Sequence, residues 1–178
     1  AAHGRGLVNN LEQVYQHLGL HWSPGLLLLV PGYIIFQSPY YLLIVQTIAL
    51  ALGAWPRFLL AKRMLPGKWP LIVAAAYLLY PSLHWANLYD FHEITFFVPL
   101  MLAALYFLEK WMGWTPLDRG RNLTGWMAFG FLALAASMKE DAILAVLFAG
   151  VYLLIKTANS KFEALNPKQY PNLNIQNI

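Results

Sequence analysis

Apolar residues run in long blocks along this chain, separated by short polar or proline-containing segments. The first block, residues 25–36, holds about a dozen residues and contains Pro31 and Gly32. A helix needs about 20 residues to cross a hydrocarbon core of about 30 Å. We therefore expect this block to form a re-entrant or interfacial helix that does not cross the membrane.

The next block, residues 39–62, is long enough to form a transmembrane helix. Pro39 suits the first turn of that helix, and Pro56 is expected to kink it. The densest basic cluster of the chain accompanies the end of this block and consists of Arg57, Lys62, Arg63 and Lys68. Because short cytoplasmic loops are rich in lysine and arginine, this end is predicted to be cytoplasmic.

Two further blocks continue the alternation across the membrane. Residues 69–83 are expected to run outward and to place residues 84–93, a polar loop, on the extracytoplasmic side. Residues 94–108 then run back inward. The loop 109–125 contains lysine and arginine, so it agrees with a cytoplasmic assignment.

The block 126–156 cannot be one simple spanning helix. A helix of that length would run about 46 Å and would place Lys139, Glu140 and Asp141 near its middle. Each charge at the bilayer centre costs about 2.5–3.5 kcal/mol, so three charges facing lipid are implausible. We predict an outward helix to about Met138, a break at the charged triplet, and a second helix that returns inward.

The pattern therefore predicts an all-α membrane protein with about five short transmembrane helices and one juxtamembrane or re-entrant helix. Residues 1–22 are expected to be an extracytoplasmic juxtamembrane segment, and residues 23–156 the helical bundle. Residues 157–178 are rich in Asn, Lys and Gln and are expected to form a poorly ordered, polar cytoplasmic tail. Helices this short favour a larger bundle or contact with other membrane subunits.

Composition supports the bilayer as the main partner. The chain is 59% hydrophobic and 11% charged, and it carries seven Trp and ten Tyr, the amphipathic rings that anchor helices at headgroup depth. Its net charge of +4 would favour nucleic acid in a soluble protein, but here the basic residues lie between apolar blocks, so no nucleic-acid partner is expected. Because cysteine is absent, thiol catalysis and Cys-ligated metal are excluded.

Most acidic and imidazole side chains near the apolar blocks fall on one face in this topology. An ionisable cluster at membrane depth is by default a candidate functional site. The extracytoplasmic set consists of His17, His21, His84, Asp90, His92, Glu93, Lys139, Glu140 and Asp141.

The segment Asp90-Phe91-His92-Glu93 has two compatible interpretations. Asp at a helix N-cap with Glu three residues later is a capping-box pattern that would simply start the next helix. If the segment is extended, Asp90 and His92 point to the same side, and the pair can hold a divalent cation or act as a base.

Lys139 and His21 also have structural alternatives. Lys139 beside two acids is either a neutralised turn between helices or an ammonium that meets an anion such as a phosphate in a cavity. His21, next to Trp22, is either an interfacial residue or a ligand. His84 and Asn87 are expected to finish a loop.

Three segments together resemble a known family. They are His21-Trp22-Ser23-Pro24, the run from Tyr80-Pro81-Ser82-Leu83-His84 to Asp90-Phe91-His92-Glu93, and Met138-Lys139-Glu140-Asp141. They resemble a bacterial and archaeal family of predicted multi-spanning membrane proteins that is catalogued as a domain of unknown function and grouped with the GT-C superfamily of polyprenyl-phosphate-sugar glycosyltransferases. The resemblance covers residues 4–156, and against this family the chain looks truncated at both ends.

The resemblance implies a GT-C-like bundle in the bacterial inner membrane with its site facing away from the cytoplasm. Asp90 would match an acidic residue in the loop after the third spanning helix, with His92 and Glu93 beside it. Lys139 would match a lysine that contacts the lipid-linked phosphate, and His21 a histidine before the juxtamembrane proline. Glu140, Asp141 and His84 would surround these residues.

Two functions of different classes follow. The first is transfer of a sugar from a polyprenyl-phosphate donor at an extracytoplasmic site. The second is a non-catalytic membrane subunit that packs in a larger complex. A transporter would also explain broken helices with charges, but the sequence lacks an inverted repeat.

Overall fold

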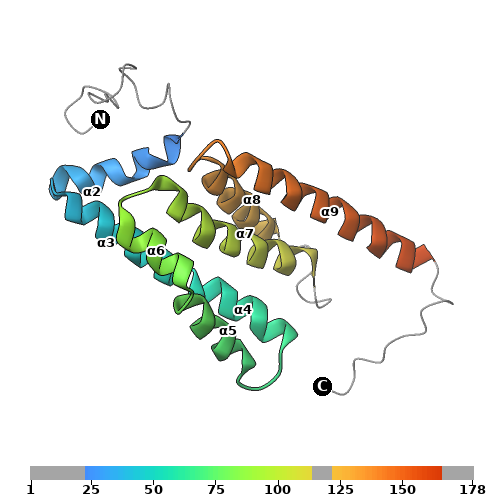
Figure 1. Ribbon diagram of the computed structural model, residues 1–178. Coiled ribbons are helices and arrows are strands. Elements are labelled where there is room, and N and C mark those ends of the chain that lie inside the picture. Colours follow the sequence, from blue (N-terminus) through green and yellow to red (C-terminus); the bar gives the residue numbers. More distant parts are fainter. Residues whose placement is uncertain (1–22, 114–121, 166–178) are drawn as a thin grey trace. The chain divides into compact units, whose positions relative to one another are not determined.

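The computed structural model describes residues 23–113 and 122–165 of the chain (Figure 1). These residues form helices joined by short links and contain no strand, which confirms the all-α prediction. The chain divides into two compact units, Ala1–Ile143 and Leu144–Ile178. The described helices up to the charged triplet belong to the first unit.

The first block forms two short helices, η1 (Pro24–Leu29) and α2 (Val30–Ile35). A proline stands in the first turn of each, where its missing N–H costs no intrahelical hydrogen bond. The combined segment of 12 residues is too short to be a candidate span. Its length therefore agrees with the prediction of a re-entrant or interfacial helix.

The second block forms α3 (Pro39–Leu52) and α4 (Ala54–Met64), which are interrupted at Gly53. Pro39 starts α3, as expected. Pro56 has no N–H for the carbonyl of Leu52, and its ring crowds that carbonyl, so the helix is disturbed one turn before the proline. The helix is thus interrupted at Gly53, three residues before Pro56, where we predicted a kink.

The third block forms α5 (Trp69–Leu78) and α6 (Pro81–Tyr89), which return beside α4 and α3 respectively (Figure 1). The Tyr77 hydroxyl on α5 donates to the Leu50 carbonyl on α3 at 2.9 Å. The assignment of residues 84–93 to a loop was wrong, because His84 and Asn87 are helical. Pro81 is suited to the first turn of a new helix, so α6 continues to Tyr89.

The fourth block forms η2 (Glu93–Phe96) and α7 (Phe97–Met112). The helix α7 packs against α4 and α8 (Asn122–Ala136). Phe107 of α7 stacks on Phe131 of α8 with ring centres 5.6 Å apart. The predicted loop 109–125 starts too early, because Glu109 and Lys110 form the last turn of α7. Residues 114–121 of that loop lie outside the described residues.

The charged triplet interrupts the last apolar block, as predicted. Residues 137–141 are not helical, and they separate α8 from α9 (Ala142–Leu165). The helix α9 continues nine residues beyond Lys156, so the polar segment expected from residue 157 begins as helix. Residues 166–178 lie outside the described part of the chain.

Four of the described helical segments have the length and apolar composition to cross a membrane: Pro39–Met64, Trp69–Tyr89, Glu93–Met112 and Ala142–Asn159. The expected fifth, α8, has 15 residues in helical conformation within the described part of the chain. The structure thus supports a multi-spanning membrane protein with four candidate spans among the described residues.

Candidate functional site

Between α6 and η2 the backbone is extended. Asp90 has φ −163° and ψ 174°, and His92 has φ −133° and ψ 128°. In extended backbone, residues two apart point to the same side, so Asp90 and His92 share one side of this link. Both residues are exposed, and Glu93, the first residue of η2, is half-buried.

Gln46, a fully buried residue in the middle of α3, holds this link in place. Its Nε2 donates to the carbonyl of Ala86 at 3.3 Å and to the carbonyl of Asp90 at 3.2 Å. Its Oε1 accepts from the backbone N–H of His92 at 3.0 Å and from the Thr95 hydroxyl at 3.1 Å. The side-chain amide therefore binds the end of α6, the extended link and the start of the next helix.

These four contacts use the two donors and the acceptor oxygen of one side-chain amide. A break between two helices leaves backbone N–H and C=O groups without helical partners, and a buried side-chain amide can satisfy several of them. Thr47, the next residue of α3, adds a contact of 2.9 Å between its Oγ1 and Oδ1 of Asn87. We name Gln46, Thr47 and Thr95 the polar clamp.

The polar clamp was missed in the sequence, where only ionisable residues were considered. The available signal was the polar pair Gln46-Thr47 inside the otherwise apolar run from Leu42 to Leu52. Two uncharged polar side chains in a transmembrane block need hydrogen-bond partners, but the sequence alone does not show which residues these partners are.

The capping-box interpretation of Asp90 was wrong in its geometry. Asp90 ends α6, and its Oδ1 accepts from the adjacent N–H of Phe91 at 2.7 Å. The N-cap of η2 is His92, whose side chain makes no capping hydrogen bond. Thr95 stabilises this turn instead, because its Oγ1 lies 2.6 Å from the His92 carbonyl, so its one hydroxyl proton is shared between this carbonyl and Oε1 of Gln46.

The second break carries Lys139 and Glu140, both half-buried, and Asp141, which is exposed. It is tied to the start of η1, where the N–H of Gly25 donates to the carbonyl of Ser137 at 2.9 Å. An apolar cavity of about 150 Å³ adjoins this contact. It is lined by Gly25, Leu26, Leu28, Leu29, Phe96, Leu100, Leu134 and Met138.

This cavity relates the two breaks to each other. Phe96, the last residue of η2, and Met138, the residue before Lys139, both line it. The links 90–92 and 137–141 therefore belong to the same end of the first unit. Convergence of the Asp90 and Lys139 side chains around one site stays a prediction.

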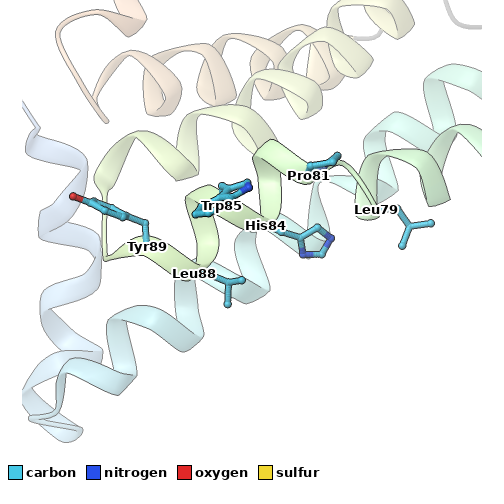
Figure 2. A pocket seen from close by; sticks show the side chains of 6 residues that line it. All are labelled: Leu79, Pro81, His84, Trp85, Leu88 and Tyr89. Carbon is cyan, nitrogen blue, oxygen red and sulfur yellow. The ribbon is translucent and has the colours of Figure 1, made fainter.

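His84 lies apart from the polar clamp, in an open groove of about 530 Å³ along the exposed side of α6 (Figure 2). The lining residues come from α6 and the link before it and are Leu79, Pro81, His84, Trp85, Leu88 and Tyr89. The groove adjoins the extended link 90–92, because the centre of the Tyr89 ring lies 5.6 Å from the centre of the His92 ring. His17 and His21 lie outside the described residues.

The sequence suggested Asp90 and His92 as ligands of a divalent cation. Within residues 23–113 and 122–165, no group of three His, Cys, Asp or Glu side chains gathers as a metal site would require. Asp90 and His92 would give a divalent cation one oxygen and one nitrogen ligand. A divalent cation stays a prediction, and no chemical step is derived through it.

Comparison with known sequences identifies the family but no characterised relative. A family model described as a predicted membrane protein, DUF2079, matches residues 1–170. No curated protein and no solved structure matches the chain significantly. The match covers nearly the whole chain, including both breaks and the polar clamp, so the chain belongs to the DUF2079 family of predicted membrane proteins.

Proposed function

We propose that this chain belongs to a membrane-embedded glycosyltransferase of the GT-C type, in which a sugar is transferred from a polyprenyl-phosphate donor at the extracytoplasmic end of the bundle. The observation that carries the proposal is the extended link held by Gln46, which places Asp90 and His92 on one side. A carboxylate and an imidazole on a rigidly held break at membrane depth are typical of a functional site.

The reaction needs a base and stabilisation of the leaving phosphate. The acceptor hydroxyl oxygen attacks the anomeric carbon, and its proton passes to the Asp90 carboxylate. The bond between the anomeric carbon and the phosphate oxygen breaks, and its electron pair stays on the polyprenyl phosphate. His92 and Glu93 would orient the acceptor.

Lys139 and His21 are assigned to the lipid-linked phosphate. An ammonium near the leaving oxygen stabilises the negative charge that develops there. Lys139 follows Met138, which lines the same cavity as Phe96, and this proximity of the two breaks supports the assignment. Glu140, Asp141 and His84 would shape the surroundings.

The test is transfer by the purified chain in nanodiscs, with radiolabelled polyprenyl-phosphate sugars and a panel of acceptor alcohols. In this assay Asp90→Asn should lower turnover at least a hundredfold with little loss of donor binding, as expected for a lost general base. Lys139→Ala should weaken donor binding. Lys156→Ala, which removes a cation from α9, is the matched control and should bind donor normally.

A non-catalytic membrane subunit is the second candidate. Little of the span Trp69–Tyr89 is buried within the chain, and Trp85, Leu88 and Tyr89 are more than three-quarters exposed, so this face contacts lipid or another protein. Absence of donor binding, together with specific crosslinks from residue 88 to a second membrane protein, would favour this candidate and reject the enzyme.

A further inference from the structure

The apolar cavity beside the two breaks is walled by three segments that are far apart in the sequence. Phe96 and Leu100 are one helical turn apart and line it from η2 and α7. Leu134 in α8 and Met138 just after that helix form a second wall, and η1 forms the third. None of the described residues that line the cavity carries a polar side chain. A ligand that fits it therefore presents hydrocarbon and no hydrogen-bonding group.

The cavity is closed on one side and open on another. Phe96 is 8% exposed and Met138 is 6% exposed, so these two side chains form the closed part of the wall. Leu28, which lines the same cavity, is 63% exposed. The cavity therefore opens to the surroundings of the protein beside η1.

The depth of the cavity places it among acyl chains. Leu100 belongs to the candidate span Glu93–Met112 and lies about 10 Å along the helix from the start of that span. The whole span of 20 residues is about 30 Å long, which is the thickness of a hydrocarbon core. The surroundings of the cavity at Leu100 are therefore lipid chains and not water.

The size of the cavity matches a short length of one hydrocarbon chain. Its volume is about 150 Å³. An apolar cavity of this size stays free of water and can hold a molecule of about six carbon atoms, such as benzene. Left empty, the cavity would deprive its lining of dispersion contacts. The end of one acyl chain that enters from the bilayer restores these contacts, whereas a second chain has no room.

We propose that this cavity binds the end of one phospholipid acyl chain, which enters beside Leu28 and packs between η1, α7 and α8. The bound chain fills the space between Phe96, at the end of η2, and Met138, within the second break. The lipid thus stabilises the arrangement of the two breaks. This role goes beyond the proposed glycosyltransfer and does not depend on it.

The experiment is photocrosslinking of the full chain in phosphatidylcholine nanodiscs that contain a trace of phosphatidylcholine with a diazirine at the end of one acyl chain. Mass spectrometry should find adducts on Leu100 and Leu134, and also on lipid-facing residues such as Leu71, which is 60% exposed on α5. Leu134→Phe adds volume inside the cavity and should lower the adducts on Leu100 about fivefold. Leu71→Phe is the matched control and should leave these adducts unchanged.

A second variant and a second measurement keep the proposal testable if Leu134→Phe folds poorly. Leu100→Phe fills the cavity from another wall and should lower the adducts on Leu134 in the same way. In delipidated detergent, added phosphatidylcholine should raise the melting temperature of the unsubstituted protein and of Leu71→Phe more than that of either filled variant. Equal adducts on the lining residues in all variants, or an equal gain in melting temperature, would overturn the proposal. Stronger labelling of the cavity by an isoprenoid alcohol with the same diazirine, at equal mole fraction, would overturn the assignment to an acyl chain.

Discussion

Nε2 of Gln46 donates a hydrogen bond of 3.2 Å to the backbone carbonyl of Asp90, 44 residues later in the chain. Through this bond the centre of α3 holds the end of α6, and through its Oε1 the same amide holds the N–H of His92 at 3.0 Å. One neutral side chain therefore satisfies backbone groups at the break that no helix partner reaches. The position of the candidate site therefore depends on a residue that carries no charge.

Replacing Gln46 should destabilise the first unit. Gln46→Leu keeps the approximate volume and removes the partners of the Asp90 carbonyl and the His92 N–H. The expected loss is about 1–3 kcal/mol in the free energy of unfolding, measured by denaturation in mixed micelles. Gln37→Leu is the matched control, because Gln37 is exposed and makes one weak local contact of 3.4 Å. Equal effects of the two substitutions would contradict the role of the clamp.

Gly25 permits the close approach of η1 to the second break. A Cβ at this position would collide with Cε of Met138 and would lie 2.8 Å from Oγ of Ser137. Gly25→Ala should therefore displace the flexible end of the Met138 side chain and lower the melting temperature slightly, at a cost of about 1 kcal/mol, and Met138→Ala should remove this collision in the double variant. Gly130→Ala is the control, because nothing lies within 4 Å of a Cβ there, and it should be neutral or stabilising.

The topology predicts that residues 65 and 88 lie on opposite sides of the membrane. The chain has no cysteine, so Leu65→Cys and Leu88→Cys each introduce a single reactive thiol, and both leucines are exposed. In right-side-out vesicles an impermeant maleimide should label position 88 and reach position 65 only after permeabilisation. Labelling of both from one side would reject the charge-based orientation.

Asp90 and Lys139 are predicted to face one site. In a double variant with cysteine at both positions, a short bifunctional thiol reagent should crosslink the pair within one molecule. Asp90→Cys with Lys68→Cys is the matched pair, because Lys68 belongs to the opposite end of the first unit, and it should give no crosslink. If the pair 90 and 139 is not crosslinked although each thiol reacts singly, the shared-site hypothesis fails.

Several features of the fold followed from local chemistry alone. A break at Lys139-Glu140-Asp141 was predicted because three adjacent charges are too costly in lipid, and a kink at Pro56 because proline lacks an N–H; the structure interrupts the helices at residues 137–141 and at Gly53. The prediction that residues 25–36 do not span the membrane followed from the shortness of that apolar block. The prediction of a loop from residue 84 failed because Pro81 was taken only as the end of a helix. Pro81 instead occupies the first turn of α6, so His84 is helical.

The sequence by itself determined the all-helical membrane class, the approximate helix boundaries and the acidic, imidazole and basic side chains available for chemistry. Only the tertiary structure decided that Gln46 reaches Asp90 and His92, and that Phe96 and Met138 line one cavity. Helix formation depends on neighbours within a few residues, which periodicity and proline positions reveal. A contact between residues more than 40 positions apart depends on how helices pack, and one sequence carries no local signal for the partner of a buried amide.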